Sequence, residues 1–173
     1  MLTEKLTREQ TISYLDTNTK GDSSYVWALI GVGITSLGQN FNPQKTTEKW
    51  IIHKNATTTT DSYQITAPVS QKCYKGDAVF EFINEIRRKA GVGSSCVSHI
   101  LDIDAWDSTT NIDEDTQEET TVCKATVYEC NISITKYNDE NAVIEYDIDY
   151  NGDPILGTVT FSNEKPTFTP DSE

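Results

Sequence analysis

The sequence predicts a mainly β protein, a sandwich or barrel with one flanking α-helix at about residues 76–89 and a long projecting β-hairpin at about 40–70. Six or seven segments alternate apolar and polar residues, which is typical of strands with one buried face. Only one segment repeats its apolar residues at helical spacing. The threonine-rich stretch within residues 39–75 has high β-propensity but too few apolar residues to bury itself, so we expect it to project and to pair with another copy.

Composition sets the broad class. The 173 residues suit a single domain, 1–173, and an apolar fraction of 36% predicts a modest core. The net charge of −13 argues against a surface that grips DNA, which needs clustered Lys and Arg. No signal peptide or membrane helix is visible, so we expect synthesis in a cytosol and no membrane partner. The four irregularly spaced cysteines are expected to be reduced structural thiols, with a disulfide or a metal site as the minority interpretation.

The first half of the chain combines a polar start with three strand-like segments. Residues 1–24 are polar and are expected to form an N-terminal arm or cap. Residues 25–37 are β-branched and interrupted by glycine, which indicates a buried strand with a bulge. Residues 46–54 are expected to form a strand that places Trp50 and Ile52 on one face. After a turn, residues 57–72 return as a long polar strand, with Pro68 confining part of it to an edge.

The helix has clear start and stop signals. Asp77 is the expected N-cap, and Gly91 and Gly93 follow the last turn, which carries three basic residues that complement the helix dipole. Its apolar stripe is formed by Val79, Phe80, Phe82, Ile83 and Ile86.

Strands are expected again after the helix. Residues 97–106 and 122–137 alternate as strands, and the acidic stretch 108–121 between them is expected to be a solvated loop. Residues 142–150 and 155–161 flank Asn-Gly-Asp-Pro, which predicts a hairpin turn. The tail, 162–173, carries two prolines and is expected to be extended.

Two strands carry rows of carboxylates. Glu145, Asp147 and Asp149 alternate with apolar residues, and Asp102 with Asp104 forms a shorter row. A solvated outer face is the plainest interpretation. A metal site or a paired-carboxylate glycosidase is a second one, although no substrate-stacking aromatics or cleft is evident. A channel lining that repels anions is the third.

Catalysis has little support in the sequence. There is no GxSxG motif, neither histidine has an evident Ser or Cys partner, and the two Gly-Val-Gly segments stand in the wrong context for a nucleotide loop. We therefore expect no enzymatic activity, no cofactor and no bound metal.

Several motifs occur in a particular order along the chain. Residues 42–63 include NP, TEKWI, KNATTT and SY. Residues 75–83 read KGDAVFEFI and are followed by Arg87-Arg88, and residues 150–159 include YNGDP and GTV. In this order they resemble the tail tube (major tail) proteins of long-tailed bacteriophages, mainly of Gram-positive hosts. The resemblance runs from about Trp27 to Phe161.

The resemblance implies a structural protein that forms hexameric rings stacked into a tube in the virion tail, assembled in the bacterial cytoplasm. Implied partners are other copies, the tape-measure protein and phage DNA in the lumen, and the tail terminator and distal tail proteins at the ends. The hairpin would reach a neighbouring ring through Lys45, Thr47, Glu48, Trp50, Ile52, Lys54, Thr57, Thr59 and Tyr63. The candidate lumen carboxylates are Glu145, Asp147, Asp149, Asp102 and Asp104. The alternative is a β-sandwich module that binds a carbohydrate or a receptor.

Overall fold

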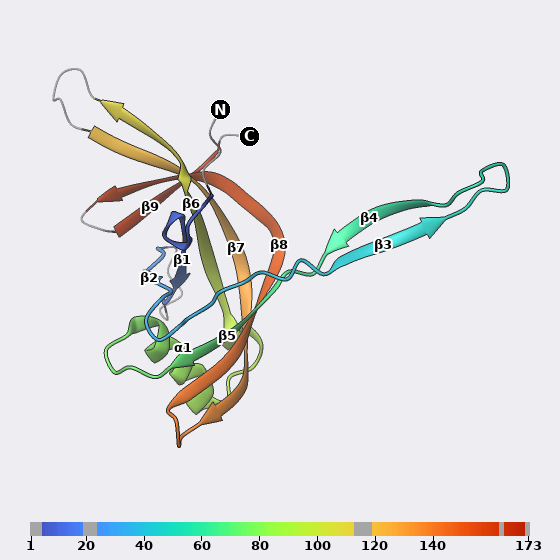
Figure 1. Ribbon diagram of the computed structural model, residues 1–173. Coiled ribbons are helices and arrows are strands. Elements are labelled where there is room, and N and C mark those ends of the chain that lie inside the picture. Colours follow the sequence, from blue (N-terminus) through green and yellow to red (C-terminus); the bar gives the residue numbers. More distant parts are fainter. Residues whose placement is uncertain (1–4, 19–23, 113–118, 163–164, 172–173) are drawn as a thin grey trace.

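The computed structural model describes residues 5–18, 24–112, 119–162 and 165–171. It is mainly β with one helix and a curled sheet, which confirms the predicted fold class (Figure 1). The main sheet has seven strands, all antiparallel, in the order β2-β1-β6-β7-β8-β5, with β9 also paired to β8. Its strands are β1 (Thr11–Asp16), β2 (Trp27–Leu29), β5 (Thr66–Lys72), β6 (Val97–Ile112), β7 (Glu119–Asn138), β8 (Val143–Ser162) and β9 (Lys165–Pro170).

The sheet carries a hydrophobic core on each of its two faces. Alternation along β6 sends Ile100 to one core and Leu101 to the other. The first core lies between the sheet and helix α1 (Ala78–Lys89). It contains the apolar face of the strand predicted at 142–150. The residues of this face, Ile144, Tyr146, Ile148 and Tyr150, are all buried.

The second core lies on the opposite face, near the other end of the long strands. Trp27 of β2 and Phe168 of β9 both pack against it, although these strands are at different margins of the sheet. The sheet must therefore curl to bring its margins together. Gly157 permits the close approach of β9, because a Cβ at this position would lie 2.3 Å from the backbone oxygen of Thr169.

Helix α1 begins as predicted. Asp77 caps it, since its side chain accepts a hydrogen bond from the Phe80 backbone N–H at 2.9 Å. Within the predicted apolar stripe, Val79, Ile83 and Ile86 are buried and the two phenylalanines are partly buried. The left-handed residue that ends the helix is Ala90, with φ of 46°, and not one of the two predicted glycines.

The N-terminal segment is part of the sheet, which corrects the prediction of an arm over 1–24. After the short 3-10 helix η1 (Arg8–Gln10), β1 lies between β2 and β6, with Tyr14 buried on one face and Leu15 on the other. A strand this short gives little periodic signal. Residues 1–4 and 19–23 of the predicted arm lie outside the described residues.

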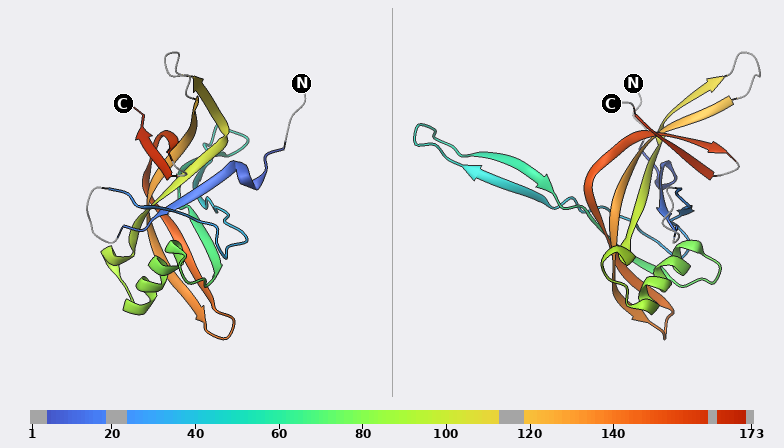
Figure 2. Two further views of the ribbon diagram at one scale, coloured as in Figure 1. Left: turned by 90° about the vertical axis from the view of Figure 1, so that its left-hand side faces the viewer. Right: turned by 180° about the vertical axis from the view of Figure 1, so that it is seen from behind.

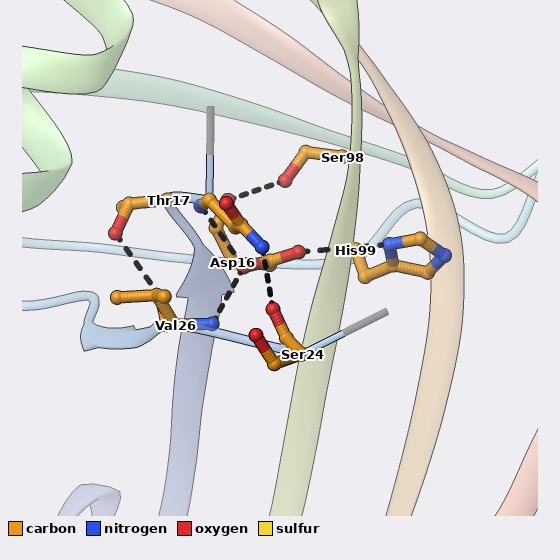
Figure 3. Close-up of polar contacts among 7 residues, drawn as sticks. Asp16, Thr17, Ser24, Val26, Ser98 and His99 are labelled. Atoms are coloured by element: carbon orange, nitrogen blue, oxygen red, sulfur yellow. Dashed lines mark hydrogen bonds and ion pairs between the residues drawn. The ribbon is translucent and has the colours of Figure 1, made fainter. Parts of the chain in front are cut away.

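A polar cluster fixes the chain where β1 ends and β2 approaches (Figure 3). Asp16 is nearly buried, and its Oδ1 accepts hydrogen bonds from the backbone N–H groups of Val26 and Asn18 at 2.8 and 3.0 Å. Its Oδ2 lies 3.8 Å from Nδ1 of His99. The Ser98 hydroxyl donates to the Asp16 backbone oxygen at 2.6 Å. These contacts position β2 at the margin of the sheet.

The segment 25–37 is not the single buried strand that the sequence predicts. Only Trp27–Leu29 pairs as a strand, and a turn follows over residues 30–33. Gly33 has φ of 76°, and a Cβ there would lie 2.4 Å from the Lys72 backbone oxygen. Gly33 therefore permits a turn that packs tightly against β5.

The prediction of an Asn-Gly hairpin between residues 142–150 and 155–161 is also wrong. Strand β8 runs through Asn151 and Gly152, because both of its halves pair with the same long neighbour, β7. Val127 pairs with Ile155, and Glu129 pairs with Asn151. Between these two pairs the chain advances by two residues in β7 but by four in β8. The predicted turn is thus a bulge.

The long strands also replace most of the predicted acidic loop at 108–121. Strand β6 continues to Ile112 and β7 begins at Glu119, while residues 113–118 lie outside the described residues. The predicted extended tail forms β9, which pairs with β8.

Candidate interaction surfaces

The projecting hairpin is a two-stranded sheet of its own. Strand β3 (Pro43–Glu48) pairs antiparallel with β4 (Thr57–Tyr63), and every residue of both strands is exposed. The hairpin points away from the body, on the side opposite to α1 (Figures 1 and 2). Isolated two-stranded ribbons are marginally stable in water, so this ribbon is suited to pairing or packing with a partner.

The bounds of the hairpin strands differ from those predicted. The first strand ends at Glu48 and not at residue 54. The expected strand 57–72 is two strands, because the chain passes from the hairpin to the main sheet at residues 64–65. Pro68 lies in β5 on an edge of the main sheet, which confirms its predicted placement.

The nine hairpin residues that the sequence points to are all exposed, but they do not form one surface. Threonine hydroxyls link the two strands: Thr47 Oγ1 lies 3.0 Å from Thr58 Oγ1, and Thr46 Oγ1 donates to Asp61 Oδ2 at 2.5 Å. Six of the nine lie on the strands, namely Lys45, Thr47, Glu48, Thr57, Thr59 and Tyr63. Trp50, Ile52 and Lys54 lie in the connecting loop, which corrects the strand predicted for them.

The loop at residues 49–56 is the far end of the hairpin and carries its largest apolar side chains. Trp50, Ile51 and Ile52 are 61%, 102% and 78% exposed. The Trp50 ring stacks on His53, with 5.8 Å between ring centroids and 6° between planes. We call residues 49–54 the tip. Ile51, the most exposed of the three, was not among the predicted contact residues.

The two chains at the base of the hairpin are linked by Asn42, which in the sequence signals only a turn. Asn42 has φ of 42°, and its Nδ2 donates to the Gln64 backbone oxygen at 3.0 Å. Asn40 and Thr66 exchange backbone hydrogen bonds of 2.8 and 3.0 Å. These bonds fix the direction in which the hairpin leaves the body.

The segment 35–41 leads to the hairpin and is anchored on Asp102. Gln39 donates from Nε2 to Asp102 Oδ2 at 2.8 Å and also contacts the Tyr150 hydroxyl at 3.0 Å. The Ser13 hydroxyl donates to Asp102 Oδ1 at 2.5 Å, and that of Tyr150 to Oδ2 at 3.4 Å. Asp102 is partly buried beneath this segment, and burial raises its pKa above the usual carboxyl value despite the three donors.

Replacing Asp102 with Asn should change how stability depends on pH. With a raised folded-state pKa, Asp102 binds its proton more tightly in the folded protein than in the unfolded chain. The contribution of Asp102 to the free energy of unfolding therefore increases as the pH falls from neutral toward about 4. A tenfold difference in proton affinity between the two states corresponds to about 1.4 kcal/mol. Urea unfolding across this pH range should show the wild type gaining stability relative to D102N on acidification. A difference independent of pH would contradict this.

The two predicted carboxylate rows lie on opposite faces of the main sheet. Asp102 shares a face with Tyr150, whereas Asp147 points away from the buried Tyr146 and Ile148 on either side of it. Both rows therefore cannot line one lumen. Asp102 and Asp104 lie on the helix side, which removes them from a surface formed by the other row.

The second row belongs to a polar face, which we call the acidic face. Glu145, Asp147 and Asp149 of β8 are partly exposed there. Their cross-strand neighbours are Ser70, Pro68 and Thr66 of β5 and, in the same order, Lys136, Ser133 and Asn131 of β7. This end of the sheet is thus covered by the helix on one side and is acidic on the other.

The described residues were also compared with the requirements of a metal site, a membrane-spanning helix and a reactive thiol. They contain no group of three or more His, Cys, Asp or Glu that could hold a metal ion. Within the same ranges, no helix is long and apolar enough to cross a membrane. All four cysteines are free, and burial raises the pKa of Cys130 to about 12, which makes its thiol a poor nucleophile.

Comparisons with known proteins add little. No family model and no curated protein matches the chain. Among solved structures, the chain is similar to one from the "Cryo-EM structure of the anti-feeding prophage (AFP) baseplate, 6-fold symmetrised", at 8% identity and a TM-score of 0.41. The match covers 90% of this chain and 97% of that chain. At this TM-score and identity, the likeness establishes neither a shared fold nor a function.

Proposed function

We propose that this chain is a structural, non-enzymatic protein that assembles with its own copies into stacked hexameric rings, forming the tube of a phage tail. The observation that carries the proposal is the hairpin, a ribbon of fully exposed strands held at its base by hydrogen bonds to the body. Exposed strand edges are an aggregation hazard for a monomer. In an assembly they are the means of contact, and the motif order in the sequence supports the same role.

The acidic face supports a DNA conduit. Non-specific binding to DNA comes largely from cations that neutralise phosphates. Lys136 and Lys72 also lie on this face, but the carboxylates outnumber them, so the wall should bind DNA weakly. Glu145, Asp147 and Asp149 would repel the phosphates, while the helix on the other side of the sheet faces outward. In this arrangement the lumen first holds the tape-measure protein and then conducts DNA. The tail terminator and distal tail proteins bind the two ends, and the protein is carried in the virion tail after assembly in the host cytoplasm.

A second candidate is favoured by one specific observation. The exposed indole of Trp50, stacked on His53 at the end of an arm, is the kind of flat aromatic surface on which a sugar ring can rest. A carbohydrate- or receptor-binding module would use the tip in this way.

Negative-stain electron microscopy of the concentrated protein should distinguish the two candidates. We expect rings or tubes with a central channel, because the hairpin and a distant surface make a head-to-tail contact that propagates. A persistent monomer that binds glycans through the tip would support the module and contradict the tube.

A further inference from the structure

The tip differs in charge from the rest of the molecule. Residues 49–54 include two lysines and no acidic residue, in a chain with 14 basic and 27 acidic side chains. Its three apolar side chains are exposed, and the Trp50–His53 stack gives part of the loop a defined shape. Exposed aromatic and cationic groups together are typical of an anchor for an acidic, partly apolar pocket.

A cleft of that character lies on the helix side of the sheet, beside the segment that leads to the hairpin. Asp102 and Asp104 of β6 form its acidic wall. Leu37, Phe41 and Tyr128 supply apolar surface, and no lysine or arginine of the described residues lines it. Phe41 is 50% exposed, so part of this apolar surface is open to a partner.

The carboxylates of the cleft have different roles. Both oxygens of Asp102 already accept hydrogen bonds within the chain. Asp104 accepts one, from Trp106 Nε1 at 3.2 Å on Oδ1. Asp104 is therefore the carboxylate that can pair with an incoming lysine, while Asp102 adds to the local negative potential.

The hairpin cannot deliver its own tip to its own cleft. Strands β3 and β4 extend away from the body (Figure 1), and six residues of strand span about 20 Å. The cleft adjoins the base of the hairpin through Gln39 and Phe41, so any tip that fills it comes from another molecule.

We propose that the tip of one copy docks in the Asp102/Asp104 cleft of a second copy, with Trp50 against the apolar wall and a tip lysine paired with Asp104. This inference rests on the proposed assembly and specifies its contact. Tip and cleft are different surfaces of the chain, so the contact is heterologous and can be repeated from one copy to the next. The opposite charges orient the approaching copy, and the aromatic burial holds it.

Charge reversal in assembled protein tests the contact. Lys49→Glu with Lys54→Glu should raise the protein concentration needed for tube growth, followed by light scattering, by at least about tenfold, which corresponds to about 1.4 kcal/mol per contact. Asp104→Lys alone should do the same, and combining it with the tip variant should restore much of the growth. Lys75→Glu, an exposed residue before α1 that lies outside both the tip and the cleft, is the matched control and should leave tube growth unchanged. Failure of the combination to restore growth would overturn the pairing with Asp104.

A photo-crosslinking phenylalanine at position 50 provides a second readout that does not depend on variant stability. In tubes mixed from isotope-labelled and unlabelled copies, we expect crosslinks between copies to peptides containing residues 37–41 or 126–128. Crosslinks confined to another surface would overturn the docking site while leaving the tube intact. Absence of tubes from the wild-type protein would instead overturn the proposed function itself, and the docking with it.

Discussion

Deleting residues 44–62 is expected to abolish tube growth while the seven-stranded sheet still folds. Strands β3 and β4 pair only with each other, so their removal takes no hydrogen bond from the main sheet. Pro43 and Tyr63 face each other in the register, and a Gly-Gly link can close the chain between them. Since no residue of 44–62 belongs to either core, the free energy of unfolding of the main sheet should change little.

Electron microscopy measures tube growth, and thermal unfolding followed by circular dichroism measures whether the main sheet still folds. A Thr58→Ala variant, which removes one hydroxyl contact within the ribbon at a residue outside the predicted contacts, serves as the control and should still form tubes. Normal tubes from the deletion would refute the role of the hairpin. Loss of the folded state would show that the ribbon is part of the body.

Changing Glu145, Asp147 and Asp149 together to Lys should slow or block DNA passage. Every copy in a ring would then present three added lysines to the DNA, instead of a surface that repels it. Each phosphate contact adds favourable counterion release, so the retained DNA should be freed as the salt concentration is raised. DNA ejection from particles, or binding of duplex DNA to assembled tubes at increasing salt, measures the effect.

Two controls separate charge on the acidic face from charge in general. The neutral variant combining Glu145→Gln, Asp147→Asn and Asp149→Asn removes the repulsion without adding cations, so it should alter ejection far less. Lysines in place of Asp139 and Glu140, which are exposed in the turn between β7 and β8, add positive charge elsewhere. Unchanged ejection by the triple lysine variant would place the acidic face outside the lumen.

The elements that sequence reasoning predicted well are those specified by local residues. The helix has a capping aspartate and an apolar stripe within a dozen positions, and both act as expected. The hairpin was evident because a polar, threonine-rich ribbon has no way to bury itself. The carboxylate row of β8 was recognisable because alternation along one strand is a local property.

The errors arise where a distant partner decides the structure. Asn151-Gly152 has the chemistry of a turn, yet β7 pairs with both sides of it and turns it into a bulge. Alternation shows which residues of one strand share a face. Whether Asp102 and Asp147 lie on the same face of the sheet depends on the register of three strands. The Asp102 contacts join residues as much as 89 positions apart, and no local pattern in the sequence indicates them.

The pairing of β1 with β6 also has a kinetic consequence. Thr11 lies opposite Asp104, while the strands β6, β7 and β8 follow one another in the chain. Closing a long loop costs more entropy than forming neighbouring strand pairs, so β1 is expected to join late in folding. Ser13 of β1 and Gln39 meet on the same carboxylate, so the Asp102 anchor of the segment that leads to the hairpin is complete only when β1 has joined. A subunit in which β1 has not yet paired would therefore present a hairpin whose leading segment lacks part of its anchor.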